Sequence, residues 1–272
     1  MLRSLYSGIS GMRGFQIKLD VIGNNIANVN TVGFKAGRVM FKDILSQTMS
    51  GVTAPVDGRG GANAKQVGLG VTISAIDTIH TPGSAMTTNV PTDLRINGDG
   101  FFAVKSTVDQ EVAFLTRSGN FMLDASRQLV NGDGMLVISS DGEPIVLDEE
   151  VKAFSISQSG EIIAVNADGT SEASGIFVGV VKITNPAGLE KLGGNMYQVT
   201  PNAMPDGEFE LGLADDLETG TGSIIAGQLE MSNVDLTAEF TEMIVAQRGF
   251  QANSRIITTS DEILQEVVNL KR

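Results

Sequence analysis

Apolar residues recur at helical spacing at both ends of the chain, whereas the middle alternates like β-structure. Near the N-terminus, Leu2 and Ile9 are seven residues apart, and a companion row runs beside them. That row consists of Leu5, Met12, Leu19 and Ile26. In the C-terminal part, an apolar residue recurs every seven positions: Leu229, Leu236, Met243, Phe250, Ile257 and Leu264. Such repeats are typical of helices that pack along a seam.

The first predicted element is a helix over residues 1–30, and it contains Gly8, Gly11 and Gly14. Each glycine costs an isolated helix about 1 kcal/mol relative to alanine. We therefore expect this helix to gain its order by packing tightly against a partner.

Four asparagines, Asn24, Asn25, Asn28 and Asn30, end the helical pattern. One interpretation is a plain helix terminus, since Asn side chains bond readily to nearby backbone groups. The other is an amide network between packed helices. Neither interpretation is catalytic, and the sequence leaves both open.

Residues 31–75 read as a linker or extended segment. Its second half, Ser50 to Gly70, is rich in Gly, Ala, Asn and Pro. A free chain of this composition is flexible, and a long ordered loop needs contacts from outside to hold it.

Residues 76–222 predict a β-rich domain, because short β-branched runs alternate with Gly-Asp and Asn-Gly turns. The stretch from Leu94 to Phe102 is echoed from Leu129 to Leu136, and each copy reads as strand, tight turn, strand. Asn-Gly is a strong hairpin signal. Regular short strands with such turns favour a sandwich or a partly closed barrel.

Residues 223–272 return to helical spacing. Asp235 is a suitable N-cap, and Glu239 and Glu242 place negative charge near the helix start. A helix over 235–270 spans about 54 Å. The N-terminal helix covers only part of its apolar line, so we expect other subunits to cover the remainder. The fold class predicted is α+β: paired, coiled-coil-like terminal helices around a central all-β domain.

The 272 residues are 42% apolar and carry a net charge of −13. That charge argues against binding nucleic acid or anionic lipid. No cysteine is present, which excludes disulfides and thiol chemistry. The N-terminus lacks the apolar core of a cleavable signal peptide, and no stretch reaches the roughly 18 apolar residues of a membrane span.

Candidate chemical sites are weak, and we predict no catalytic residue, cofactor or metal. Asn97 and Asp99 supply too few oxygen ligands for a calcium loop, and a distal Glu is missing. Asn166, Asp168 and Thr170 alternate better but lack flanking carboxylates. The single histidine, His80, is a poor candidate for a hydrolase triad, because the sequence contains no Gly-x-Ser-x-Gly motif for a nucleophilic serine.

Three stretches resemble the bacterial flagellar rod and hook proteins. Leu19 to Lys35 (LDVIGNNIANVNTVGFK) is similar to the N-terminal signature of that family, and Ser232 to Leu270 to its C-terminal signature. Leu115 to Ile138 (LTRSGNFMLDASRQLVNGDGMLVI) resembles its β-domain motif. The resemblance covers essentially the whole chain, with the three motifs in order.

The resemblance implies a structural axial subunit that self-assembles helically and transmits torque from motor to filament. Its terminal helices line a central export channel, and its β-domain forms the outer layer. Expected partners are further copies of the chain, neighbouring rod, hook and hook-junction proteins, and the flagellar type III export apparatus. The resemblance also implies that the protein is exported without a cleaved signal peptide and assembles outside the cytoplasmic membrane. Hook and distal rod both remain open. The alternative is a soluble cell-surface binding or cell-wall-acting module with a β-domain.

The expected assembly interface follows the two terminal apolar patterns and the asparagine cluster. It comprises Leu5, Ile9, Met12, Leu19, Asn24, Asn25, Ile26, Asn28, Leu229, Leu236, Met243, Phe250, Ile257 and Leu264.

Overall fold

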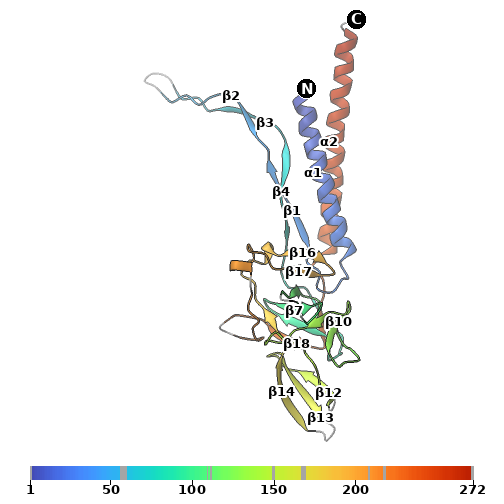
Figure 1. Ribbon diagram of the computed structural model, residues 1–272. Helices are drawn as coiled ribbons and strands as arrows, with labels where there is room; N and C mark the ends of the chain where they lie inside the picture. The colour runs from blue at the N-terminus through green and yellow to red at the C-terminus, as the bar shows by residue number, and fades with distance from the viewer. Residues whose placement is uncertain are drawn as a thin grey trace. The chain divides into compact units, whose positions relative to one another are not determined.

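The computed structural model divides the chain into two compact units (Figure 1). The helix–ribbon unit comprises Met1–Ala27, Gly37–Thr78 and Asp235–Arg272, and the β unit comprises Asn28–Ala36 and Ile79–Val234. The structure describes residues 2–55, 60–108, 110, 112–148, 151–166, 170–207, 209–216 and 219–270. Asp168 of the weak calcium candidate lies outside the described residues.

In the helix–ribbon unit, the long helices α1 (Leu2–Ala27) and α2 (Leu236–Leu270) pack side by side. They run antiparallel, because Gly8 near the start of α1 meets Ile257, and Lys18 further along meets Glu242. The α+β class is thus confirmed in its broad form, with terminal helices and a mostly β centre.

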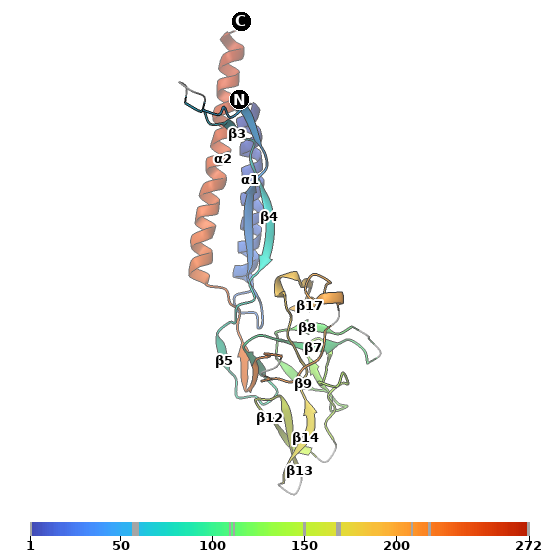
Figure 2. The same ribbon diagram turned by 90° about the vertical axis from the view of Figure 1, so that its left-hand side faces the viewer.

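An antiparallel β-ribbon lies against another face of α1 (Figures 1 and 2). Strand β1 (Gly37–Asp43) pairs with β4 (Val71–Thr78), and β2 (Ser46–Ser50) pairs with β3 (Lys65–Gly68). The two pairs form one ribbon, because the Ile44 amide donates to the Gly70 carbonyl over 3.1 Å and the Leu69 amide to Leu45 over 2.9 Å.

This ribbon makes up much of the stretch over 31–75 that was predicted as a linker or extended segment. Every residue of β2 and β3 is exposed, so neither face needs apolar side chains. An alternation of buried and exposed residues is the main sequence signal for a strand, and it is missing here.

In the β unit, the largest sheet has the order β16–β17–β8–β7–β11–β10–β9, with β15 beside β7. Its strands are Glu190–Gly193, Met196–Gln198, Phe114–Thr116, Phe101–Lys105, Leu136–Val137, Leu129–Asn131 and Phe121–Leu123, with β15 at Val180–Val181. Strands β12 (Val151–Ile156), β13 (Glu161–Asn166) and β14 (Ser171–Phe177) form a second sheet. Two short pairs join distant segments: β5 (Ala85–Thr87) with β19 (Gln228–Glu230), and β6 (Leu94–Asn97) with β18 (Ser223–Ala226). Short 3-10 turns lie at Pro186–Gly188 and Pro205–Gly207.

Two buried apolar clusters lie in the β unit. One is centred on Leu94, Phe102 and Phe121, and the rings of Phe102 and Phe121 meet edge to face at 5.2 Å between centroids. The other surrounds Leu115 and Tyr197. Burial of this kind is the main favourable term in folding, so the β unit holds a core of its own.

The two copies of the Asn-Gly-Asp-Gly repeat fold differently. The second copy is a hairpin, in which β10 pairs with β11 and the Asn131 side chain accepts hydrogen bonds from the amides of Asp133 and Met135. The first copy is not a hairpin, because β6 pairs with β18 and β7 pairs with β8, β11 and β15. The hairpin prediction was therefore wrong for Leu94 to Phe102.

The C-terminal helix begins later than the apolar spacing predicted. Residues 223–230 form β18 and β19, and Leu229 is buried in β19. Asp235 caps α2 as expected: its Oδ1 accepts hydrogen bonds from the amides of Thr237 (2.9 Å) and Ala238 (3.3 Å). Leu229 thus precedes the helix, and its place in the seven-residue line is a correction to the predicted helical row.

Candidate assembly surface

The contact between α1 and α2 combines glycines with polar and apolar side chains. Gly8, Gly11, Phe15, Lys18 and Asn25 of α1 lie opposite residues of α2. Those partners are Ile257, Asn253, Gly249, Glu242 and Glu239. The α1 positions follow one another at intervals of three, four or seven residues, so they lie on one face of the helix.

Two glycines leave room for side chains of the facing helix. A Cβ on Gly11 would lie 2.7 Å from Nδ2 of Asn253, and one on Gly249 would lie 2.6 Å from Cζ of Phe15. On a neighbouring face of α1, a Cβ on Gly14 would lie 2.9 Å from Cε1 of Phe41 in β1. The partners that the glycines of α1 imply are therefore elements of the same chain: α2 and the ribbon.

Asn25 joins three elements of the helix–ribbon unit. Its side-chain amide donates to the Gly37 carbonyl over 2.9 Å and to Oε1 of Glu239 over 3.0 Å, and its Oδ1 accepts from the Gly37 amide over 2.9 Å. Burial raises the pKa of Glu239, although the Asn25 hydrogen bond opposes that rise. Asn25 thus acts as an amide link between packed elements.

The other asparagines play different parts. Asn28 closes a turn, since it accepts hydrogen bonds from Thr31 on both its backbone and its side-chain oxygen, each over 3.1 Å. Asn24 is exposed on α1. Both sequence interpretations therefore apply, each to a different residue of the cluster.

Most residues of the predicted C-terminal line flank the helix contact. Ile257 touches the α1 face at Gly8, whereas Met243 and Leu264 are half-buried. Leu236 and Phe250 keep about two fifths of their surface exposed, at 40% and 37%. The row therefore stays partly uncovered within one chain.

The rest of α2 is rich in uncovered apolar side chains. The exposed ones are Phe240, Ile244, Val245, Ile256, Ile263, Val267, Val268 and Leu270. Among the described residues of α2, only Ala246 and Ser260 are fully buried. Exposed apolar patches of this extent mark protein–protein contact sites.

On α1, the predicted residues Leu5, Met12, Leu19 and Ile26 are half-buried, while Ile9 is exposed. Ile9 lines an open groove of about 490 Å³ on the helix–ribbon unit, between α1 and the ribbon. Tyr6, Ile17 and Ile44 line the same groove and are exposed too.

A buried charge cluster in the β unit was not anticipated from the sequence. Nζ of Lys35 lies 2.6 Å from Oε1 of Glu230, and a guanidinium nitrogen of Arg117 lies 3.1 Å from Oε2. Lys35 is 0% and Glu230 is 1% exposed. Nζ of Lys35 also donates to the Thr81 carbonyl, and the Gly83 amide donates to Glu230.

Burial alone would raise the pKa of Glu230, but Arg117 and Lys35 outweigh it and the net shift is downward. The carboxylate is therefore charged at neutral pH. It holds four segments of the β unit together: Asn28–Ala36, the stretch around Gly83, the residues after β8 that include Arg117, and β19. No local pattern marks these residues, because Lys35 and Glu230 are 195 positions apart.

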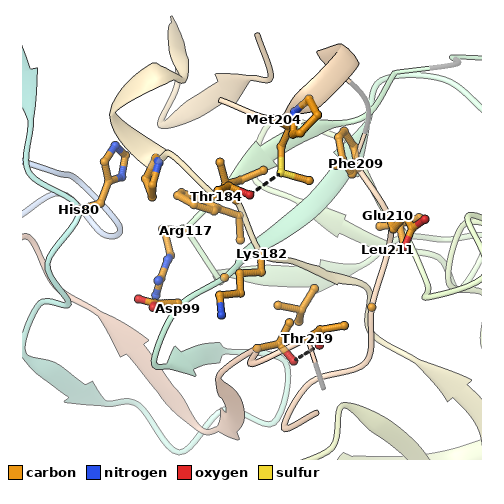
Figure 3. Close-up of a pocket in the computed structure, with 18 residues that line it drawn as sticks. His80, Asp99, Arg117, Lys182, Thr184, Met204, Phe209, Glu210, Leu211 and Thr219 are labelled. Carbon is orange, nitrogen blue, oxygen red and sulfur yellow. Dashed lines mark hydrogen bonds between the residues drawn. The ribbon is translucent and has the colours of Figure 1, made fainter. Parts of the chain in front are cut away.

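An open groove of about 960 Å³ lies in the β unit (Figure 3). His80, Asp99 and Arg117 lie toward one side of it, and Glu210 toward the other. Nδ1 of His80 has no hydrogen-bond partner among the described residues, so no carboxylate there orients the ring as a general base requires.

His80 packs instead against aromatic rings. Its ring centroid lies 5.7 Å from that of Phe101 and 5.5 Å from that of Tyr197. Burial, reinforced by the positive charges of Lys35, Lys191 and Arg117, lowers its pKa to about 4. His80 is a neutral packing residue at physiological pH.

Within the described residues, no group of His, Cys, Asp and Glu is arranged to hold a metal ion. None of the described helices combines the length and apolar character that crossing a membrane requires.

Models of known protein families match both ends and the centre of the chain. Residues 5–35 match the flagella basal body rod protein model, residues 95–164 the flagellar hook protein FlgE/F/G D1 domain, and residues 225–270 the flagellar basal body rod FlgEFG protein C-terminal model. These ranges include most of α1, strands β7 to β11 of the main sheet, and α2.

Individual relatives match over their full length. The chain is 51% identical to the flagellar basal-body rod protein FlgG of Bacillus subtilis (strain 168) over 276 residues, covering 100% of both chains. It is 38% identical to FlgG of Borreliella burgdorferi over 277 residues, again covering 100% of both. The flagellar hook protein FlgE of the same organism is 30% identical over 449 residues, with 100% of both chains covered.

Among solved structures, the Helicobacter pylori flagellar hook protein FlgE2 matches 62% of this chain and 47% of its own, at 15% identity and a TM-score of 0.24. That likeness is too low to bear on the fold.

Terminal helices with uncovered apolar faces, in a chain whose β unit holds a separate core, define a structural subunit of a larger assembly. The chain belongs to the family of bacterial flagellar rod and hook proteins. It is a structural axial subunit of the flagellum, not an enzyme, and it assembles with neighbouring flagellar proteins of the basal body and hook. The alternative, a cell-surface or cell-wall-acting module, is not favoured.

Proposed function

We infer that the chain is a subunit of the flagellar rod, at its distal part, rather than of the hook. The support comes from length: the FlgG relatives align with this chain over 276 and 277 residues, whereas the FlgE alignment extends to 449. The hook-protein alignment therefore includes segments that have no counterpart in this chain.

The subunit polymerises helically through its terminal helices, which pair like a coiled coil and line a central export channel. The observation that carries this proposal is the uncovered apolar surface of α2, where Phe240 is 48% and Ile244 is 59% exposed. Burying apolar surface contributes about 25 cal/mol for each Å² removed from water, so a neighbouring copy that covers this surface gains stability.

The interface of that polymer consists of the half-buried and exposed residues of the predicted rows on α1 and α2, together with Asn24. Asn25 is buried and supports this surface from within the chain, through its bonds to Gly37 and Glu239. Leu229 and Asn28 belong to the β unit and act there, in a strand and a turn. The subunit reaches its place through the flagellar type III export apparatus and contacts the neighbouring rod, hook and hook-junction proteins.

The exposed part of the ribbon, β2 and β3, contacts adjacent subunits. A lone two-stranded hairpin is marginally stable in water, and all residues of β2 and β3 are exposed. Such contacts set the stiffness of the tube. Deleting residues 53–64, part of which lies outside the described residues, should change tube curvature while assembly persists and the β unit stays folded.

Electron microscopy of tubes grown from the purified chain tests the proposal. Straight tubes are the expected result for a rod subunit. Curved tubes would assign the chain to the hook, and a chain that stays monomeric at every concentration and ionic strength would contradict helical self-assembly.

A further inference from the structure

The groove between α1 and the ribbon is an apolar surface with one charged lining residue, Arg13. Tyr6, Ile9 and Ile17 contribute from α1, and Ile44 from the ribbon. Tyr6 is 69% exposed, which is costly for a large aromatic side chain unless something covers it.

The α2 helix of the same chain does not reach this groove. It packs on the α1 face that carries Gly8, Gly11 and Phe15. Tyr6, Ile9 and Arg13 lie on a different face, since each residue turns an α-helix by about 100°. The groove is therefore open to a partner from outside the chain.

The last ten described residues of α2, Asp261–Leu270, carry an apolar stripe that also lacks cover. Ser260 is the last fully buried residue of α2, and beyond it only Leu264 is half-buried. Ile263, Val267 and Leu270 are exposed and follow at intervals of four and three, so they form one stripe. An apolar helix stripe laid into an apolar groove is a common mode of recognition.

The charges of the two surfaces are complementary. Asp261, Glu262 and Glu266 accompany the apolar stripe, and the basic residues Lys271 and Arg272 come only after the segment 261–270 in the sequence. The groove presents Arg13 and no acidic lining residue. Complementary charge speeds association and fixes the register of two surfaces more than it adds affinity.

We propose that this groove binds the segment Asp261–Leu270 of a second copy of the chain. The inference rests on the proposed self-assembly and specifies one of its contacts. A groove on one subunit that receives a different surface of the next is a heterologous contact. When its rotation does not close into a ring, such a contact generates an open helical array, which is the symmetry of a tube.

The contact also cannot form within one chain. Ile257 lies beside Gly8, and Val267 is ten residues further along α2, about 15 Å away. A disulfide from position 9 to position 267 therefore reports a contact between two subunits.

Disulfide cross-linking tests the proposal directly, because the natural chain has no cysteine. The double variant Ile9→Cys/Val267→Cys is oxidised under assembly conditions and separated on a non-reducing gel. The matched control is Ile9→Cys/Met122→Cys, since Met122 is an exposed residue of the β unit. Pelleting and electron microscopy of the same samples record whether tubes form.

A ladder of covalent multimers in the 9/267 variant, at least about tenfold stronger than in the 9/122 control, is the expected result. Tubes without that ladder would overturn the groove contact and leave self-assembly intact. If neither tubes nor ladder form at any protein concentration, both this inference and the proposed function fail.

A charge exchange gives a second readout. Arg13→Glu and Glu266→Arg should each raise the critical concentration for assembly about threefold, because each places like charges together. The double variant should return the value close to that of the natural chain. Additive losses in the double variant would contradict the pairing of these surfaces.

Discussion

The β unit and the helix–ribbon unit use apolar residues in opposite ways. In the β unit, Leu94, Phe102 and Leu115 are completely buried, and two clusters of such residues fill the interior. In the helix–ribbon unit, Ile22 is a rare fully buried large residue among those described, whereas Phe240, Ile244 and Val268 face outward. The β unit is thus complete within one chain, and the helix–ribbon unit is completed by its neighbours.

The helix–ribbon unit also depends on glycines for its close helix contact. The α1–α2 contact relies on Gly11 and Gly249, whose replacement brings a Cβ within 2.7 Å and 2.6 Å of the facing helix. Glycine-rich helices are weak in isolation. Their use here fits a unit whose final stability comes from assembly.

The largest change in the free energy of unfolding is expected for a core residue of the β unit. Phe102→Ala should lower the free energy of unfolding by about 3–5 kcal/mol, because it removes a buried ring and leaves a cavity. Phe240→Ala is the matched control, since Phe240 lies exposed on α2, and it should change the value by less than about 0.5 kcal/mol. Denaturant unfolding can be followed through the buried Tyr197 in a Tyr6→Phe background. Equal losses of unfolding free energy in the two variants would contradict the difference in burial between the two units.

Glu230→Gln should cost the β unit about 3 kcal/mol, because it leaves the buried charges of Lys35 and Arg117 without a counter-charge. Glu190→Gln, on the exposed strand β16, is the control and should be near neutral. The same denaturation experiment measures both. If Glu230→Gln leaves the free energy of unfolding unchanged, the charge cluster is exposed to water in solution.

Truncation on α2 should act on assembly instead of on folding. Phe250→Ala and Leu264→Ala should each cost the assembled tube about 2–5 kcal/mol if the polymer buries these side chains, while the β unit unfolds at an unchanged denaturant concentration. The critical concentration for polymerisation measures the loss. If Phe250→Asp still forms normal tubes, Phe250 does not lie in the interface.

Acid should weaken the β unit in two steps. His80 has a folded pKa of about 4 against an ordinary value of 6.5, so the folded state binds fewer protons, and its contribution to stability is lost as pH falls from 6.5 toward 4. The pKa of Glu230 is also lowered, so its contribution disappears below the ordinary value of 4.5.

His80→Phe keeps an aromatic ring against Phe101 and Tyr197 but cannot take up a proton. Thermal unfolding at pH 7 and pH 5 should therefore show a smaller fall in the melting temperature for the variant than for the natural chain. An equal fall in both proteins would assign the acid sensitivity to other groups.

The sequence predicted the elements whose signals are local. Asp235 identified the start of α2 through its capping chemistry, and the glycines of α1 indicated close packing before any partner was known. The rod and hook family was also recognised from three continuous stretches, which the family comparison confirms.

Features set by distant residues were missed. The ribbon strands β2 and β3 have no buried face and so no alternation to detect. Leu229 matched the helical row by spacing alone, but pairing with Met86 holds it in a strand. The cluster of Lys35, Arg117 and Glu230 joins residues 113 and 195 positions apart, and nothing in the local sequence distinguishes these charges from solvent-exposed ones.

Hydrogen exchange of the natural chain, compared between dilute monomer and assembled tubes, tests the central claim most directly. We expect the amides of α1, α2 and the ribbon to exchange rapidly in the monomer and to become protected in the tube, whereas the core strands β7 and β8 are protected in both. Equal protection of α2 in monomer and tube would contradict the claim that the helix–ribbon unit is completed by its neighbours.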